Sequence, residues 1–168
     1  LASRGALFPL SYTLDHCGPL SWTAEDSAIA MEVIAGFDPL DPGSADVPVP
    51  DFRGKLGKGV QGLRLGLPRD WFAKADGVSD ETIRAIDDAA QTLAKLGATI
   101  EEIELPDYEL FNACGRVILL SEAYAIHEKD FQTRPLDYGL YTHLRIFMGA
   151  MVTAADLTQA MRLRRELT

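Results

Sequence analysis

One stretch, residues 63–106, constrains the fold more than any other because its apolar pattern changes period twice. "LRLGLP" (63–68) is short, alternates apolar residues and stops at a proline, which is typical of a strand. Residues 79–96 then carry apolar side chains at spacings of three and four, which predicts a helix. "ATIEEIELP" (98–106) indicates a second strand. Strand, helix and strand in this order predict a βαβ unit, which we expect to be parallel and right-handed.

The helix of this unit has clear ends and two different faces. Ser79 is placed to cap its N-terminus, acidic residues occupy its first turn, and Gly97 ends it. The predicted buried stripe consists of Ile83, Ile86, Ala90 and Leu93. The predicted solvent face consists of Arg84, Asp87, Asp88, Gln91 and Lys95. Acids spaced along a solvated face indicate neither a metal site nor acid–base catalysis.

The rest of the chain predicts one helix before this unit and a helical part after it. Thr23 can cap the first helix, which is apolar on nearly every face, so we expect it to be largely buried and to end at a left-handed Gly36. Later helices are predicted over 108–131, 139–151 and 154–167. We expect a single partial domain, 1–168, made of a sheet-core motif with the buried helix (1–36), a loop (37–62), the βαβ unit (63–106) and the helical part (107–168).

Composition limits the partners and the compartment. A net charge of −9 argues against nucleic acid or an anionic membrane as a partner, since both require a basic face. No apolar run approaches the roughly 20 residues needed to cross a bilayer, and the N-terminus does not resemble a signal peptide. We therefore expect a cytoplasmic protein. The missing initiator Met predicts a processed chain or a piece of a longer one, and the last helix, which ends without a Gly or Pro stop, favours a piece.

Cysteines and histidines are too scattered to predict a metal centre. Cys17 and Cys114 make no zinc framework, and two reduced thiols are favoured over a disulfide. His16, His127 and His143 form no paired-ligand motif. No cofactor is expected.

Two short motifs suggest catalysis, but the residue order argues against both. Lys58 lies in "GKLGKGVQG", yet Gly59 follows it and a strand comes next, so a solvated loop is favoured over a phosphate loop. Asp15 and His16 could form a dyad, and His16 and Cys17 a thiol–imidazole pair. Adjacent side chains on an extended chain point in different directions, however. Composition and spacing alone therefore predict a soluble α/β domain with no visible active site.

The N-terminal region resembles a segment of the amidase-signature hydrolases. That segment reads G-x-x-P-x-x-x-S-L-D-H-x-G-P, followed by R-T-x-x-D-A-A and I-A-G-x-D-P-x-D; here the chain has "SRGALFPLSYTLDHCGPLSWTAEDSAIAMEVIAGFDPLDP". The positions in register are Gly5, Pro9, Leu14, Asp15, His16, Gly18, Pro19, Thr23, Asp26, Ile34, Ala35, Gly36, Asp38, Pro39 and Asp41. Similarity continues through "GVQGLRLGLPRDWF", "SEAYAIHEKDFQTRPLDYG" and "TAADLTQAMRLRREL", so it covers essentially the whole chain. Thr13 replaces the usual Ser and keeps a hydroxyl, whereas Trp22 replaces the usual Arg and loses a cation.

The resemblance implies an α/β fold: a fragment of the amidase-signature fold, with a mixed sheet, a βαβ unit and covering helices. It also implies hydrolysis of a carboxylic amide to an acid and ammonia or an amine through a Ser–Ser–Lys triad. In the family that triad precedes the motif that opens this chain, so no catalytic residue is carried over and the chain alone is expected to be inactive. Residues 11–36 would form the wall beside the active site, with Asp15 and His16 near the substrate or, alternatively, in structural hydrogen bonds.

Two other functions stay open. In the amidotransferase branch of the family, which acts on glutamyl-tRNA, an N-L-A-R-x-D-G run stands where this chain has residues 126–130, which favours a general amidase acting on a small or aryl-alkyl amide. A non-catalytic α/β binding module is the other alternative. The expected partners are a small-molecule amide, for the parent enzyme, and further copies of the chain. Copies would associate through a truncated sheet edge and an apolar face near residues 7–20 and along 24–35.

Overall fold

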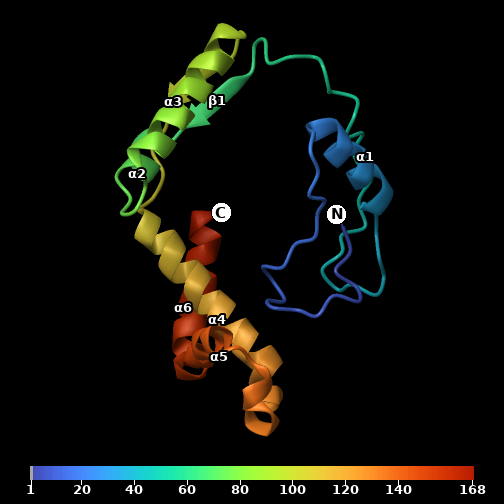
Figure 1. The fold of residues 1–168 in the computed structure, drawn as a ribbon, viewed down its shortest axis with the longest axis vertical. Helices are drawn as coiled ribbons and strands as arrows, with labels where there is room; N and C mark the ends of the chain where they lie inside the picture. The colour runs from blue at the N-terminus through green and yellow to red at the C-terminus, as the bar shows by residue number, and fades with distance from the viewer. Residues whose placement is uncertain (1) are drawn as a thin grey trace.

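The computed structural model describes residues 2–168 as an open arch of three parts (Figure 1). In this view an N-terminal segment with one helix lies on the right, a βαβ unit lies at the upper left, and a helical part lies below that unit. The elements are α1 (Ala24–Ile34), β1 (Arg64–Leu67), α2 (Arg69–Ala73), α3 (Asp80–Lys95), β2 (Thr99–Glu102), α4 (Tyr108–Thr133), the 3₁₀ turn η1 (Pro135–Asp137), α5 (Leu140–Phe147), the 3₁₀ turn η2 (Met148–Met151) and α6 (Ala154–Leu167). Among the described residues, no helix combines the length and hydrophobicity that a membrane crossing needs.

The predicted strand–helix–strand unit is present. β1 pairs directly and in parallel with β2, in a register that sets Arg64 opposite Thr99. Ser79 caps α3 by accepting a hydrogen bond from the Thr82 amide, as expected. The turn after α3 uses Gly97 at a φ of 99°, a left-handed conformation that favours glycine. Local capping signals therefore located both ends of this helix.

Details of the unit differ from the sequence prediction. The sheet described in residues 2–168 has two parallel strands, so the expected mixed sheet is not seen there, and β2 is shorter than the predicted 98–106. The apolar stripe of α3 is correctly placed but only half-buried, because a two-stranded sheet covers little of it. Asp87 does not simply face water: its carboxylate accepts hydrogen bonds from Nε and Nη2 of Arg69, at 2.8 and 2.7 Å. Arg69 begins α2, a short helix that the proline stop at position 68 concealed.

The first helix is capped as predicted but is not buried. Thr23 accepts a hydrogen bond from the Asp26 amide, whereas Ala28 is the one buried residue among those described in α1. Val33 is 80% exposed, and no helix or strand of the described residues covers this helix, beside which only loops run (Figure 1). Gly36 does not have the predicted left-handed conformation; α1 ends instead at an extended Ala35. Residues 2–36 contribute no strand, only an isolated antiparallel bridge from Ala2 to Ala35, so the expected sheet-core role is not seen.

The helical part contains most of the buried apolar side chains. α6 runs back along α4 and buries a cluster centred on Ile118, Cys114 and Ala160 (Figure 1). α5 and the end of α4 enclose a second cluster, of Ala123, Phe131 and Ile146. Thr153 and Asp156 form a reciprocal capping box that starts α6. The three predicted helices are thus present, although 139–151 divides into α5 and η2.

Candidate functional site

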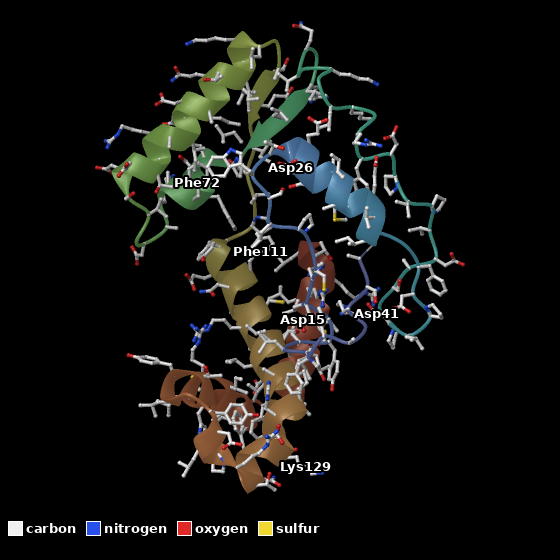
Figure 2. The ribbon with its side chains drawn as sticks, turned by 45° about the vertical axis from the view of Figure 1, so that its right-hand side comes forward. Asp15, Asp26, Asp41, Phe72, Phe111 and Lys129 are labelled. Carbon is white, nitrogen blue, oxygen red and sulfur yellow. The ribbon has the colours of Figure 1, made fainter. Side chains whose placement is uncertain are left out.

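The candidate site centres on the turn of residues 11–15, which lies beside the α4–α6 pair (Figure 2). Ser11 is fully buried, and its hydroxyl donates a short hydrogen bond to Glu122 on α4. The same carboxylate accepts the Thr13 amide at 3.0 Å and the Thr13 hydroxyl at 2.8 Å. Burial raises the pKa of Glu122, but these hydrogen bonds lower it more. The resulting pKa lies below its ordinary value, which favours the charged carboxylate. One charged side chain thus fastens the turn to α4.

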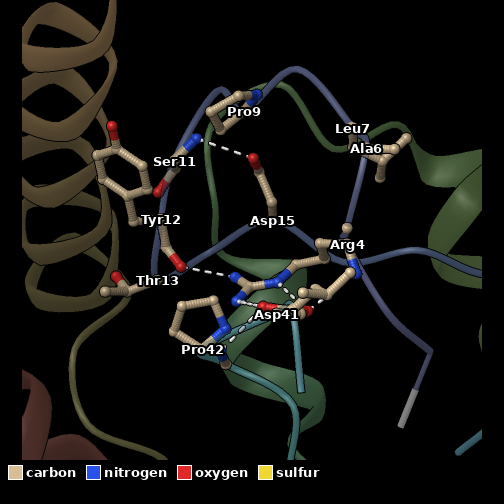
Figure 3. Close-up of a pocket in the computed structure, with 13 residues that line it drawn as sticks. Arg4, Ala6, Leu7, Pro9, Ser11, Tyr12, Thr13, Asp15, Asp41 and Pro42 are labelled. Carbon is tan, nitrogen blue, oxygen red and sulfur yellow. Dashed lines mark hydrogen bonds and ion pairs between the residues drawn. The ribbon is translucent and has the colours of Figure 1, made fainter. Parts of the chain in front are cut away.

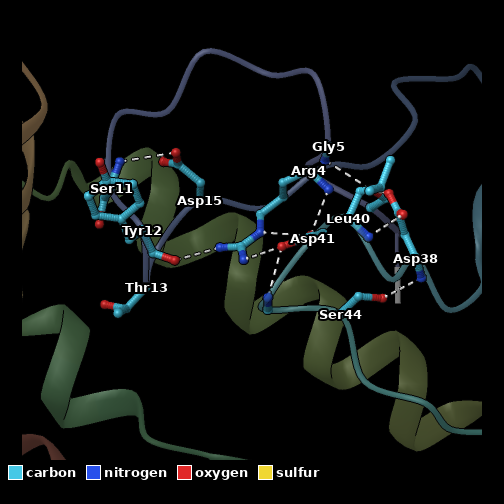
Figure 4. A network of polar contacts seen from close by, with 12 residues as sticks. Arg4, Gly5, Ser11, Tyr12, Thr13, Asp15, Asp38, Leu40, Asp41 and Ser44 are labelled. Atoms are coloured by element: carbon cyan, nitrogen blue, oxygen red, sulfur yellow. Dashed lines mark hydrogen bonds and ion pairs between the residues drawn. The ribbon is translucent and has the colours of Figure 1, made fainter.

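An ion pair holds the opposite side of the turn (Figure 4). Arg4 donates through Nη2 and Nε to the two oxygens of Asp41, at 2.8 and 3.2 Å, and its backbone amide adds a third bond at 2.8 Å. The remaining guanidinium nitrogen donates to the Tyr12 carbonyl at 2.6 Å. Asp41 is 6% exposed, and the Arg4 guanidinium holds the pKa of this carboxyl well below its usual range. The Arg4–Asp41 pair therefore links the turn to the loop after α1.

A cavity of about 550 Å³ lies between this turn and that loop (Figure 3). Its apolar lining includes Leu7, Pro9, Leu40 and Pro42. Its polar lining includes Arg4, Ser11, Thr13, Asp15 and Asp41. An apolar cavity with a few fixed polar groups is the usual form of a small-molecule site.

Asp15 and His16, the predicted substrate-contact residues, lie near this cavity but do not act as a pair. Asp15 accepts the backbone amides of Leu10 and Ser11, at 2.8 and 3.0 Å, so its carboxylate has a structural role. His16 is exposed, with Nδ1 2.6 Å from the Leu14 carbonyl oxygen. A second cavity of about 340 Å³ is lined by both residues and by Cys17. Contact with a substrate remains a prediction for both.

Two other reactive groups of the described residues, Ser3 and Cys114, make structural hydrogen bonds. Ser3 donates to Asp38 at 2.5 Å, and the Cys114 thiol donates to the Ala160 carbonyl at 3.1 Å. Both cysteines are free thiols. Lys58 is exposed in a loop, so the structure offers no phosphate loop there. Within residues 2–168, no group of three His, Cys, Asp or Glu side chains is placed to hold a metal ion.

Sequence reasoning missed the roles of Arg4, Asp41 and Glu122. Asp41 was in register with the family motif, but its partner lies 37 residues away. Glu122 lies 111 residues from Ser11 and sits in the middle of a long helix, where a glutamate normally faces water. Neither pairing leaves a local signal, because both depend on how distant segments meet.

Comparison with known proteins gives the family. A profile of the amidase family matches residues 1–168. The chain belongs to the amidase family. An amidase of Pseudomonas putida is 41% identical over 155 residues, which cover 92% of this chain and 33% of that protein. The A subunit of the glutamyl-tRNA(Gln) amidotransferase of Geobacter sp. (strain M21) is 39% identical over 123 residues, which cover 73% of this chain and 25% of the relative.

A solved structure supports the same fold for this amidase-family chain. It is an inhibitor-bound chain described as part of a vestigial protein complex that reveals the evolutionary origins of an s-triazine catabolic enzyme. It superposes with a TM-score of 0.89 at 33% identity, covering 99% of this chain and 35% of the other. The chain thus spans between a quarter and about a third of the length of these relatives.

Proposed function

We propose that this chain forms one wall of the active site of an amidase that hydrolyses a carboxylic amide to an acid and ammonia or an amine. Family membership supports the reaction. The observation that carries the assignment to a wall is the turn of residues 11–15, which is held from two sides by Glu122 and Arg4 and lines a cavity of about 550 Å³. A turn held in this way is a preorganised surface for a ligand.

The nucleophile belongs, in this proposal, to a Ser–Ser–Lys triad in residues outside these 168. A serine hydroxyl needs an adjacent base and oxyanion donors to attack an amide. Ser3 and Ser11 donate to carboxylates, and Ser21 contacts the Ser27 hydroxyl. No serine in the described part of the chain hydrogen-bonds a lysine amine. Asp15 and His16 would contribute to the substrate side of the pocket.

A glutamyl-tRNA amidotransferase component is the second candidate, because proteins of that kind are also similar to this chain. The Pseudomonas putida amidase is 41% identical over 92% of this chain, whereas an amidotransferase A subunit that covers 94% of it, from Acidobacterium capsulatum, is 35% identical, which favours the amidase. In residues 126–130, where the amidotransferase branch has N-L-A-R-x-D-G, His127 is buried and its Nδ1 lies 2.8 Å from the Tyr138 hydroxyl. Glu128 and Lys129 of the same segment are exposed. Because residues 126–130 depart from the amidotransferase run, we propose a small or aryl-alkyl amide as the substrate class.

The test is hydrolysis by two proteins: the 168-residue chain and the full-length protein encoded around it. We expect the chain to release no ammonia from small aliphatic or aryl amides and not to react with a serine-directed fluorophosphonate. The full-length protein should release ammonia from these amides and react with the fluorophosphonate, without any aminoacyl-tRNA. Turnover by the chain alone would overturn the proposed location of the triad. An inactive full-length protein would favour the non-catalytic binding module.

We also propose that copies of the isolated chain associate through their uncovered surfaces. The two-stranded sheet has no third strand in residues 2–168, and strand edges recruit other strands. Large apolar side chains are exposed in the predicted region, among them Phe8, Leu20, Trp22 and Val33. Light scattering should show dimers or larger species, and Leu20→Ser with Val33→Ser should reduce them. A monomer that binds no apolar dye would contradict this proposed association.

We also propose a reducing, cytoplasmic compartment, which the two free thiols support.

A further inference from the structure

We propose that Glu122 is a positioning residue of this amidase: it fixes the turn of residues 11–15 and so sets the shape of the proposed substrate wall. The inference rests on the proposed function, because the wall matters only if a substrate binds there. Glu122 itself touches none of the cavity. It acts through Ser11 and Thr13, which both line the cavity.

The contacts of Glu122 are unusual for a mid-helix glutamate. It is one of 26 residues in α4, yet its two oxygens accept three hydrogen bonds, all from one turn that is remote in sequence. One of those bonds takes the Thr13 backbone amide, so the carboxylate controls the main chain and not only the side chains. Hydrogen bonds to a charged acceptor are stronger than neutral ones.

Two arginines hold the same turn, and together with Glu122 they form what we call the clamp. Arg164 on α6 donates to the Thr13 hydroxyl at 3.1 Å, so Thr13 connects both helices. On the cavity side, the Arg4 guanidinium donates a hydrogen bond to the Tyr12 carbonyl oxygen at 2.6 Å. The peptide bond between Tyr12 and Thr13 is therefore held at its oxygen by Arg4 and at its nitrogen by Glu122. Tyr12, which lies between these anchors, is 58% exposed and is one of the residues that line the cavity.

Apolar packing offers a competing explanation for the fixed turn. Leu14 packs against the cluster of Ile118, Cys114 and Ala160, and this contact alone could hold residues 11–15. The two explanations predict different results when Glu122 loses its carboxylate, because Leu14 is unchanged by that substitution. A variant at Glu122 therefore separates them.

The experiment compares Glu122→Ala and Glu122→Gln in the full-length protein, with Glu128→Ala as the matched control. Glu128 lies on the same helix and is exposed. Glutamine keeps one acceptor oxygen for Ser11 and the Thr13 amide but loses the charge, so Glu122→Gln should recover much, but not all, of the parent's behaviour. Two readouts are needed: hydrogen exchange in peptides that cover residues 11–15, and the separate values of kcat and KM.

For Glu122→Ala we expect exchange in residues 11–15 to quicken and KM to rise by about tenfold or more, the equivalent of losing hydrogen bonds to a charged group. We expect kcat to stay within about twofold, because the nucleophile is elsewhere. Recovery in Glu122→Gln would confirm that hydrogen-bond geometry is responsible. Unchanged exchange would show that the remaining contacts of the turn, those of Leu14, Arg4 and Asp15, suffice without Glu122, and would overturn the clamp.

The same experiment distinguishes failure of this inference from failure of the proposed function. An inactive parent protein overturns the proposed function and the substrate role of the turn together, while exchange still decides whether Glu122 holds it. An active parent in which Glu122→Ala speeds exchange but leaves KM unchanged overturns the positioning role alone.

Discussion

Different interactions stabilise the N-terminal segment and the helical part of this chain. In residues 2–62, the buried side chains include Ser11 and Asp41, and the main fastenings are the contacts of Arg4 and Glu122. In residues 108–167, the buried side chains are mostly apolar or aromatic, as in the clusters around Ile118 and Phe131. Polar fastenings are directional and set a geometry, whereas apolar clusters supply area and stability. The proposed substrate wall belongs to the first region.

The largest effect should come from the apolar core. Ile118 is 1% exposed at the centre of the α4–α6 cluster, and Ile118→Ala should lower the free energy of unfolding by about 2 to 5 kcal/mol. Val33 is 80% exposed on α1, so Val33→Ala should change it by less than about 0.5 kcal/mol. Urea denaturation followed by helical circular dichroism measures both. Equal effects would mean that the two regions are not held differently.

Two glycines of the helical part should respond in opposite directions. Gly149 sits against α4, where an added Cβ would collide with the Leu120 carbonyl oxygen and lie 2.6 Å from Cβ of Tyr124. Gly149→Ala should therefore destabilise the protein by about 1 to 3 kcal/mol. Gly115 on α4 has open space, so Gly115→Ala should stabilise it by about 0.5 to 1 kcal/mol. Thermal melts of both variants test this; stabilisation by Gly149→Ala would contradict the close approach.

Acid should loosen the N-terminal segment before the helical part. The pKa values of Asp41 and Glu122 lie below their ordinary values of 3.8 and 4.5 in the folded protein, mainly because Arg4 binds Asp41 and because Ser11 and Thr13 offset the burial of Glu122. Their stabilisation is present above the ordinary values and is lost as pH falls through the lowered ones. Hydrogen exchange from pH 7 to about 2, corrected for intrinsic rates, should show protection lost first in residues 2–44.

A neutral variant provides the control for that titration. Asp41→Asn removes the charge that Arg4 pairs with, so it should loosen residues 2–44 already at pH 7 and weaken their dependence on pH. Protection of residues 108–167 at pH 7 should stay unchanged. Loss of protection in both regions at the same pH would show that they unfold as one unit.

Local chemistry made most of the elements predictable. Thr23, Ser79 and Thr153 each cap the helix predicted to follow them, and the apolar period of 79–96 identified the face of α3 that meets the sheet. These signals act within one turn of helix or a few residues of chain, so they can be read without knowing the fold. The family motif could also be recognised in the sequence, because its residues lie close together along the chain.

The sequence by itself determined the long helices and three of their N-caps, the parallel βαβ unit and the family. Only the tertiary structure decided that α1 lies exposed, that Asp87 pairs with Arg69, and that Glu122 reaches the turn of residues 11–15. The physical reason is the sequence separation of the residues that interact. A cap or an apolar period depends on neighbours along the chain, whereas burial and the partner of a charged side chain depend on which distant segment packs beside it.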